Sequence, residues 1–312
     1  MPSGSGLCSG SKFDPLEDIP DLSGKVILVT GGTAGLGRQT VVHLARHNPS
    51  HIYFTGRNAK QADHIIQEVT ASGTSGTTLR FLECDFTSLA SVRAAANAVI
   101  AEQDHLDLLM ANAGIMDLPP SLTQDGYELQ FGVNYMSHAL LVRHLLPLLE
   151  RSADHPRVVV LTSAAFRAVP IAFDDLKTTQ DNFKVMGGIM RYGQSKLANL
   201  LLAKELARRY PAITTVAVTP GIVHTDLVRK QTGIRYAITW LSAYLTQGGF
   251  IKTERGAYSQ LWCVAMPKEK LVPGALYEPV GVLSKMSSKH SEDEKLSGQL
   301  WEWTDAELKK WD

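Results

Sequence analysis

The chain has 312 residues, of which 44% are hydrophobic, so it is long enough to bury a sizeable core. Lysine plus arginine and aspartate plus glutamate number 31 each, and the formal net charge is zero. This balance gives no basic field that would favour nucleic acid, and the sequence holds no RNA- or DNA-binding motif. The cysteines fit neither a zinc site nor a disulfide framework, which indicates a reducing compartment: Cys8, Cys84 and Cys263.

Residues 1–24 predict a polar N-terminal arm. They lack the basic start and apolar run of a signal peptide, so we expect a cytoplasmic protein, with peripheral membrane association as an open alternative. The longest apolar patch, "YAITWLSAYL" at 236–245, is shorter than the about 20 residues that span a bilayer. It predicts a buried core helix, a lid over a substrate, or a helix at an interface, and the sequence leaves these three open.

Strand-like apolar runs alternate with helical patterns through most of the chain. The predicted strands lie at 25–30, 51–56, 79–85, 106–114, 157–163, 214–221 and 274–279. Between them, apolar residues recur at three- and four-residue spacing, as in helices that cover a sheet. This alternation predicts one α/β domain over 25–284: a doubly wound, Rossmann-type parallel sheet of about seven strands with helices on both faces.

The tail at 285–312 is polar and carries no chemical signal. Thr304 and Glu307 have capping-box spacing, which predicts a short closing helix there. Three tryptophans predict docking on the body of the protein or at a subunit contact: Trp301, Trp303 and Trp311.

A glycine-rich turn, "TGGTAGLG" at 30–37, follows the first predicted strand. Glycines at such a strand-to-helix turn let the backbone approach a pyrophosphate, and the helix N-terminus then offers free N–H groups to phosphate. A cluster of glycines by itself also fits a plain tight turn. Its position after the first strand favours a dinucleotide site that includes Gly31, Gly35, Leu36 and Gly37.

The second predicted strand indicates which dinucleotide is bound. Many NAD enzymes place an acidic residue near this strand end to bind the ribose 2′-hydroxyl. Here Thr55 and Gly56 stand instead, and Arg57 follows, with Lys60 close by in sequence. A guanidinium binds a 2′-phosphate through charge-assisted hydrogen bonds, although a solvent-exposed arginine is the simpler alternative. We expect NADP(H).

The stretch "RYGQSK" at 191–196 places Tyr192 and Lys196 four residues apart, on one face of a helix. The pair also fits an ordinary wet helix surface. A phenol has a pKa of about 10, and a nearby cation favours the phenolate. We therefore expect Lys196 to lower the pKa of Tyr192, so that Tyr192 acts as general acid/base. Ser163 ends the predicted strand at 157–163, on the crevice side of such a sheet, where its hydroxyl would orient the substrate oxygen.

The T-G-x-x-x-G-x-G spacing of the turn resembles that of the short-chain dehydrogenase/reductase family. Other motifs of that family follow in order: "NAG" at 112–114, "VN" at 133–134, "LTS" ending at Ser163, "YGQSK" at 192–196 and "PGIVHT" at 220–225. The resemblance covers roughly residues 25–266. The stretches "FDDL" at 173–176 and "YGQSKLANLLLAKELARRY" at 192–210 look like the retinol-dehydrogenase and protochlorophyllide-reductase-like branch.

The resemblance also implies roles that the residues alone do not. Asp85 and the backbone of Phe86 would contact adenine, although Asp85 alternatively fits a helix N-cap. Asn112 and Gly114 would line the cofactor, and Asn112 equally fits a brace of the sheet. The cofactor-binding residues that we expect are Gly31, Gly35, Leu36, Gly37, Arg57, Lys60, Asp85, Phe86, Asn112, Gly114, Tyr192, Lys196, Pro220, Gly221, Val223 and Thr225.

By the same resemblance, Val223 and Thr225 lie near the nicotinamide carboxamide, whereas Pro220 and Gly221 alternatively form a plain turn. Lys196 would bind the nicotinamide ribose. Asn134 would bend its helix and hold a water that links the lysine to solvent; by itself it fits a packing residue. We expect no metal site.

The expected function is an NADP-dependent oxidoreductase that transfers a hydride between the nicotinamide and a ketone, aldehyde or secondary alcohol. Substrate choice would lie in segments near 166–190 and 226–255, and the apolar patch favours a lipophilic small molecule. Two other classes stay open: a non-redox dehydratase, isomerase or cyclase on the same scaffold, and a non-catalytic nucleotide-binding regulator. The sequence does not decide the oligomeric state.

Overall fold

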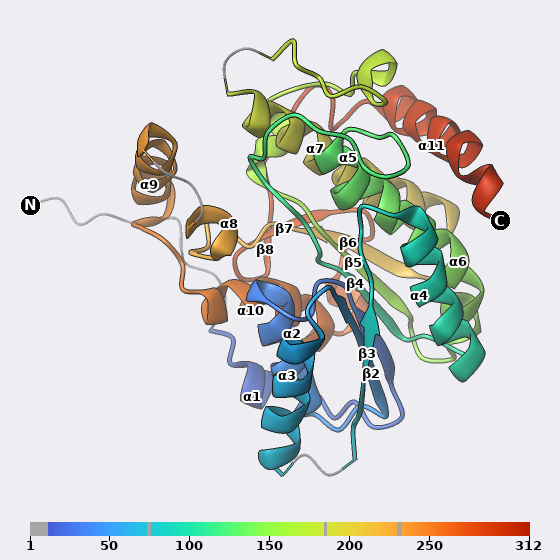
Figure 1. Cartoon of the computed structure of the whole chain (residues 1–312). Helices are drawn as coiled ribbons and strands as arrows, with labels where there is room; N and C mark the ends of the chain where they lie inside the picture. The colour runs from blue at the N-terminus through green and yellow to red at the C-terminus, as the bar shows by residue number, and fades with distance from the viewer. Residues whose placement is uncertain (1–11, 74–75, 184–185, 230–232) are drawn as a thin grey trace, which may run out of the picture.

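The computed structural model describes residues 12–73, 76–183, 186–229 and 233–312. Over these residues one α/β domain forms around an eight-stranded sheet with the strand order β3-β2-β1-β4-β5-β6-β7-β8 (Figure 1). Neighbouring strands are parallel except for β7 and β8, which pair antiparallel. The strands are β1 (Val26–Val29), β2 (His51–Gly56), β3 (Thr78–Glu83), β4 (Leu108–Ala111), β5 (Arg157–Leu161), β6 (Thr214–Val218), β7 (Leu276–Glu278) and β8 (Val282–Leu283).

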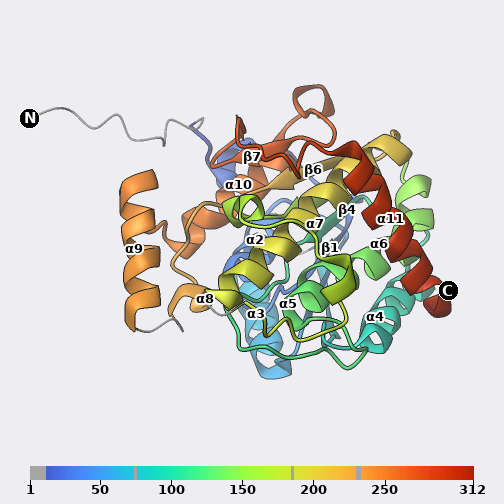
Figure 2. The ribbon, with the colours of Figure 1, turned by 90° about the horizontal axis from the view of Figure 1, so that it is seen from above.

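Helices cover both faces of the sheet, as the apolar strands require. One face carries α2 (Gly35–Ala45), α3 (Ala59–Ala71) and α10 (Thr253–Ala265), and the other carries α4 (Leu89–Glu102), α6 (Ser137–Arg151) and α7 (Gly187–Arg209) (Figures 1 and 2). Each face has its own buried apolar cluster, because alternate residues of each strand point to opposite sides. The Rossmann-type fold predicted from the sequence is confirmed.

The sheet has one strand more than expected. The predicted strand at 274–279 corresponds to β7, and the short β8 returns beside it through a turn that contains Gly281, at φ +73°. Both residues of β8 are exposed. The strand therefore has no run of buried apolar residues by which the sequence could predict it.

The described part of the N-terminal arm is not a purely polar segment. Asp14 caps a short helix, α1 (Pro15–Asp18), through a hydrogen bond from Leu16 N to its carboxylate. Ile19 and Leu22 follow it and are buried in the cluster beneath α10. The remainder of the predicted arm, residues 1–11, lies outside the described residues.

The closing helix is longer than predicted. The helix α11 (Glu294–Leu308) begins ten residues before Thr304, because Asp293 accepts hydrogen bonds from Lys295 N and Leu296 N and so provides the N-cap. The capping-box interpretation of Thr304 and Glu307 is therefore wrong: Thr304 is a buried residue inside the helix. The helix docks on α7, and its tryptophans pack against the core of that face, as one of the two alternatives predicted.

The apolar patch at 236–245 forms part of α9 (Gly233–Gln247), which stands at the edge of the molecule (Figures 1 and 2). Trp240, Leu241, Tyr244 and Leu245 are all exposed, and the rings of Trp240 and Tyr244 stack on each other. The core-helix alternative is therefore wrong for this patch, apart from the buried Ala243. Among the described helices, none is both long and apolar enough to cross a membrane.

Candidate active site

The glycine turn connects β1 to α2 and is shaped for close backbone approach. Gly31 and Gly35 have φ values of +66° and +53°, which favour glycine. A Cβ on Gly37 would collide with Gly31 O and come within 2.6 Å of Asn112 Nδ2. Within the described part of the chain, no side chain caps the first turn of α2, so its N–H groups face the turn. This is the arrangement that binds phosphate at a helix N-terminus.

The end of β2 has no place for an acidic residue. Thr55 is fully buried and braces the turn: Gly31 N donates to its Oγ1 at 3.1 Å, and Gly32 N donates to its carbonyl at 2.8 Å. A Cβ on Gly56 would collide with the side chain of Thr33. The next residue, Arg57, is exposed at this edge.

An open cavity of about 590 Å³ lies beside the turn. Its lining consists of Thr33, Ala34, Arg57, Asn58, Ala59 and Lys60. The structure thus brings both predicted cations, Arg57 and Lys60, to one cavity next to the N-terminus of α2. A cavity with two cations and a helix N-terminus suits an anionic group.

Asp85 follows β3, and its carboxylate accepts a hydrogen bond from Thr87 N at 2.9 Å. The N-cap of α4 is Ser88, whose hydroxyl accepts from Ser91 N at 3.4 Å, so the N-cap alternative for Asp85 is wrong. Phe86 is buried, and its ring packs on the ring of His138 at 5.1 Å. The predicted adenine contacts of Asp85 and Phe86 stay predictions.

Asn112 and Thr30 lock β4 to the glycine turn. Asn112 Nδ2 donates to Thr30 O at 2.8 Å, and Asn112 N donates to Thr30 Oγ1 at 2.8 Å. The sheet-brace alternative for Asn112 is confirmed. A Cβ added to Gly114 would lie 3.2 Å from Asn134 Oδ1 and 3.5 Å from Lys196 Nζ, so the end of "NAG" lies against both.

The segment after β6 returns to the glycine turn. Gly221 has a φ of +77°, and Val223 pairs with Ile251 in an isolated parallel bridge. The Cγ2 of Thr225 lies 3.9 Å from where a Cβ of Gly35 would stand. The fold therefore places Val223 and Thr225 on the same side of the sheet as the turn, although almost 190 residues separate them in sequence.

Tyr192 lies on α7, and its phenol interacts with the hydroxyl of Ser163, which follows β5. Burial raises the pKa of Tyr192 to about 12, and the nearby Ser163 hydroxyl opposes this rise. The ammonium of Lys196 lies 5.6 Å from the centre of the phenol ring. The net effect on the pKa of Tyr192 is the rise caused by burial, and the expected lowering by Lys196 stays a prediction.

Lys196 is buried at 4% exposure, one turn beyond Tyr192. Its Nζ donates to Leu161 O at 3.0 Å, at the end of β5. Burial lowers the pKa of Lys196 to about 7, because no carboxylate among the described residues pairs with the ammonium to offset its desolvation. The wet-surface alternative for this pair is therefore wrong for Lys196, which points into the site.

Asn134 lies in a single turn of π-helix, η1 (Gly132–Met136), which precedes α6. The π-turn interrupts the regular helix at Asn134, and π-turns often occur at functional sites. The predicted bend stays a prediction. The Asn134 amide makes two hydrogen bonds to the backbone of Ile115. Its Oδ1 accepts from Ile115 N at 2.8 Å, and its Nδ2 donates to Ile115 O at 3.0 Å. Its Nδ2 also donates to Ser195 Oγ at 2.9 Å. The predicted water relay stays a prediction.

Sequence reasoning missed His138, one turn after Asn134. Its ring bridges Asn134 O at Nδ1 and Thr30 Oγ1 at Nε2, both at 2.8 Å. Burial lowers its pKa to about 4, so the ring is neutral. A carbonyl only accepts, which assigns the proton to Nδ1 and makes Thr30 the donor to Nε2. Nothing in the local sequence signals this bridge, because its partner lies 108 residues away.

Similarity to known proteins agrees with this geometry. A family model described as short chain dehydrogenase matches residues 25–172. A short-chain dehydrogenase/reductase of Aspergillus calidoustus is 36% identical, over 94% of this chain and 96% of its own. Human retinol dehydrogenase 11 is 33% identical, over 96% of this chain and 87% of its own.

Solved structures show the same fold. A blue fluorescent protein from a metagenomic library, in complex with NADPH, superposes with a TM-score of 0.64 at 27% identity. The match covers 84% of this chain and 98% of that structure. The glycine turn, the Tyr192–Lys196–Ser163 group and these likenesses agree, and the chain belongs to the short-chain dehydrogenase/reductase family, in the branch that contains retinol dehydrogenases.

Proposed function

We propose that the protein is an NADP(H)-dependent oxidoreductase that transfers a hydride between the nicotinamide and a lipophilic ketone, aldehyde or secondary alcohol. The observation that carries this proposal is the group formed by Tyr192, Ser163 and Lys196. A phenol beside a serine hydroxyl, with an ammonium one helical turn away, can hold and protonate one carbonyl oxygen.

The residues present fit an NADP(H) cofactor, which supplies the hydride when bound. The glycine cradle would hold the pyrophosphate, and Arg57 with Lys60 would hold the 2′-phosphate in the cavity beside Thr33. The steric limit at Gly56 supports NADP(H) over NAD(H), because an acidic side chain has no room there. The NADPH found in the metagenomic relative is consistent with this assignment.

In the reducing direction, Ser163 would donate a hydrogen bond to the substrate oxygen, and Tyr192 would give that oxygen its proton. The raised pKa of Tyr192 suits this role, since the phenol keeps its proton at neutral pH. The phenolate that remains would be stabilised by Lys196 and reprotonated from solvent through the relay predicted at Asn134. Reduction is therefore the direction that we propose.

The lipophilic substrate class rests on two observations. The exposed apolar face of α9 borders the segment after Thr225, which would close over the nicotinamide side of the site. The name of the human relative specifies retinol, a lipophilic alcohol. The non-redox and non-catalytic alternatives are less favoured, because neither needs a buried lysine beside a tyrosine and a serine.

The test is the Tyr192→Phe variant, which keeps the ring and removes the proton. We expect NADPH binding, followed by cofactor fluorescence, to be retained. Turnover of a ketone panel should fall by about two to four orders of magnitude, the usual contribution of a positioned acid. Tyr210→Phe, at the other end of α7, is the matched control. Near-normal turnover of Tyr192→Phe would refute the proposal, and a product of unchanged oxidation state would select a non-redox enzyme.

A further inference from the structure

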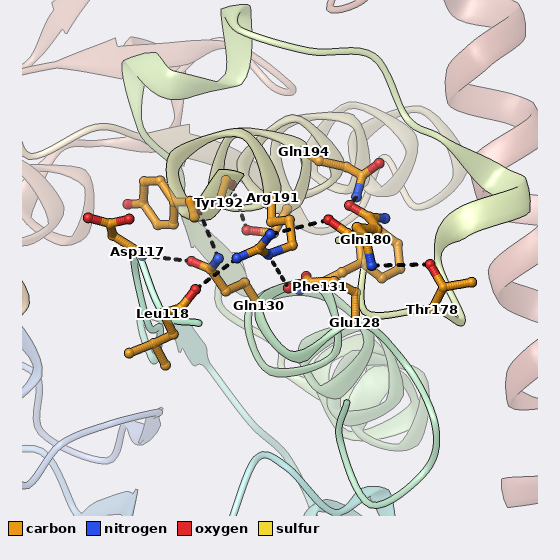
Figure 3. Close-up of polar contacts among 12 residues, drawn as sticks. Asp117, Leu118, Glu128, Gln130, Phe131, Thr178, Gln180, Arg191, Tyr192 and Gln194 are labelled. Atoms are coloured by element: carbon orange, nitrogen blue, oxygen red, sulfur yellow. Dashed lines mark hydrogen bonds and ion pairs between the residues drawn. The ribbon is translucent and has the colours of Figure 1, made fainter. Parts of the chain in front are cut away.

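The segment 115–118 follows the "NAG" motif and is fixed by buried side chains. Asn134 binds both backbone groups of Ile115, as described above. Two residues on, Asp117 N donates to Gln130 Oε1 at 2.9 Å, and Gln130 Nε2 donates to Gly188 O at 2.9 Å (Figure 3). Gln130 is 1% exposed and joins this segment to the first turn of the catalytic helix α7.

Arg191 fixes the next residue of the segment. Its Nη2 donates to Leu118 O at 2.9 Å, and its Nε lies 3.3 Å from Glu128 Oε1 in a buried ion pair (Figure 3). Arg191 is 2% exposed and Glu128 is fully buried. Glu128 Oε2 accepts from Phe131 N at 2.7 Å, which orients the carboxylate. Arg191 therefore holds the carbonyl of Leu118 through one buried hydrogen bond.

Between these anchors, Asp117 adopts a left-handed conformation with a φ of +54°. Aspartate adopts this conformation more readily than most residues other than glycine. The carboxylate lies over Gly188, where a Cβ would collide with Asp117 Oδ1 and stand 3.0 Å from its Cα. Only a glycine allows Asp117 to lie this close to α7.

This contact puts Asp117 on the face of α7 that carries Tyr192. Gly188 precedes Tyr192 by four residues, so the two positions are neighbours on one helix face. In Figure 3 the side chains of Asp117 and Tyr192 extend to the same side of α7, away from the ion pair of Arg191 and Glu128. Asp117 is half-buried at this face of α7.

We propose that Asp117 is a specificity-determining residue, which accepts a hydrogen bond from a hydroxyl or amino group that the substrate carries besides its reacting carbonyl. An ionised carboxylate is only an acceptor, and its roughly four lone-pair directions can accept more than one hydrogen bond. A site built around such an acceptor discriminates against analogues that lack the donor. The inference rests on the proposed function and adds to it a class of substrate: a lipophilic carbonyl compound with a second, donor group.

The experiment compares acetophenones that differ in one group. The probes are the monohydroxy isomers, the monoamino isomers, and methoxy counterparts that keep the oxygen but donate no hydrogen bond. We expect wild-type kcat/KM with NADPH to be at least about 10-fold higher for one hydroxy or amino isomer than for its methoxy counterpart. Asp117→Asn and Asp117→Gly both tolerate the left-handed backbone, so they change the carboxylate without forcing the segment to move.

In both variants that ratio should fall at least about fivefold towards 1, because the donor loses its charged acceptor. Asp174→Asn removes an exposed carboxylate from the neighbouring segment and should leave the ratio unchanged. Whether hydroxyl or amine gives the larger ratio identifies the donor. A ratio near 1 in the wild type, or one unchanged in both Asp117 variants, overturns the inference.

A binding measurement separates this inference from the proposed redox function. The dissociation constants of the same probes are measured with NADPH present, for Tyr192→Phe and for Tyr192→Phe combined with Asp117→Asn. A hydroxy-over-methoxy preference that disappears with Asp117 supports the inference even where the wild type reduces none of the probes; that result would count against the redox function alone. Equal affinities of the two proteins for every probe overturn the inference.

Discussion

At the scale of single residues, the buried ammonium of Lys196 destabilises the fold to an extent that depends on pH. Its pKa is lowered to about 7 by burial, whereas an unfolded lysine titrates near its ordinary value of 10.5. Between these values the unfolded chain binds more protons than the folded chain, so the stability of the fold rises with pH there. The destabilisation from burying the ammonium is therefore full below pH 7 and fades as the pH rises towards 10.5.

We accordingly compare the free energy of unfolding of Lys196→Met with that of the wild type at each pH. We expect this difference to favour the variant most at pH 6.5. The advantage of methionine should shrink steadily by pH 9, because the wild-type lysine then folds in its neutral form. Urea denaturation at several pH values gives the difference directly. Lys268→Met, at an exposed position, is the control and should show no such trend. A difference that is independent of pH would show that the buried amine does not titrate in this range.

At the scale of elements, α11 supports the π-turn that carries Asn134. Tyr135, the neighbour of Asn134 in η1, shares a hydrogen bond of 2.7 Å with Thr304 Oγ1 on α11. Both side chains are buried, and burial raises the pKa of the Tyr135 phenol well above its ordinary value. A buried polar contact thus ties the C-terminal helix to the π-turn that carries Asn134.

We expect Thr304→Val to destabilise the fold by about 1–3 kcal/mol, because it leaves the buried hydroxyl of Tyr135 without a partner. Combining it with Tyr135→Phe removes both polar groups and should recover much of that loss. Denaturant titration of the wild type, both single variants and the double variant measures the coupling. Thr304→Ser retains the hydroxyl and serves as the control. Strict additivity of the two single variants would contradict this account of the interface.

At the scale of the whole molecule, the features that could be predicted from the sequence are those set by residues close together in the chain. The apolar strands, the glycine turn and the i, i+4 spacing of Tyr192 and Lys196 depend on neighbouring residues, and they predicted the fold and the site. The pairing of Arg191 with Glu128 joins residues 63 positions apart by number, and no local period indicates it. The left-handed Asp117 likewise depends on contacts that only the assembled fold provides.

The misplaced start of α11 and the pKa of Tyr192 have a related physical cause. Thr304 has capping-box spacing, but packing of an amphipathic helix from Glu294 onward outweighs a local cap signal. Lys196 is near Tyr192 as predicted, yet the degree of burial decides the sign of the pKa shift, and burial is a property of the folded chain.

The cofactor site also joins distant parts of the molecule, since the turn after β1 meets the cavity after β2 and the segment after β6. A ligand that binds only the folded chain stabilises it by mass action, by about 2.7 kcal/mol at a ligand concentration of 100 times its dissociation constant.

We therefore expect NADPH to raise the melting temperature more than NADH at equal concentration. Arg57→Ala should weaken NADPH binding by about one to two orders of magnitude, as expected for a lost hydrogen bond between charged groups, and leave NADH binding nearly unchanged. Arg46→Ala, exposed at the far end of α2, is the control. An unchanged preference for NADPH over NADH in Arg57→Ala would show that Arg57 does not bind the 2′-phosphate. The preference for NADPH would then have to come from Lys60, or from the Thr33 side chain, which lies against Gly56 and leaves no room for an acidic residue there.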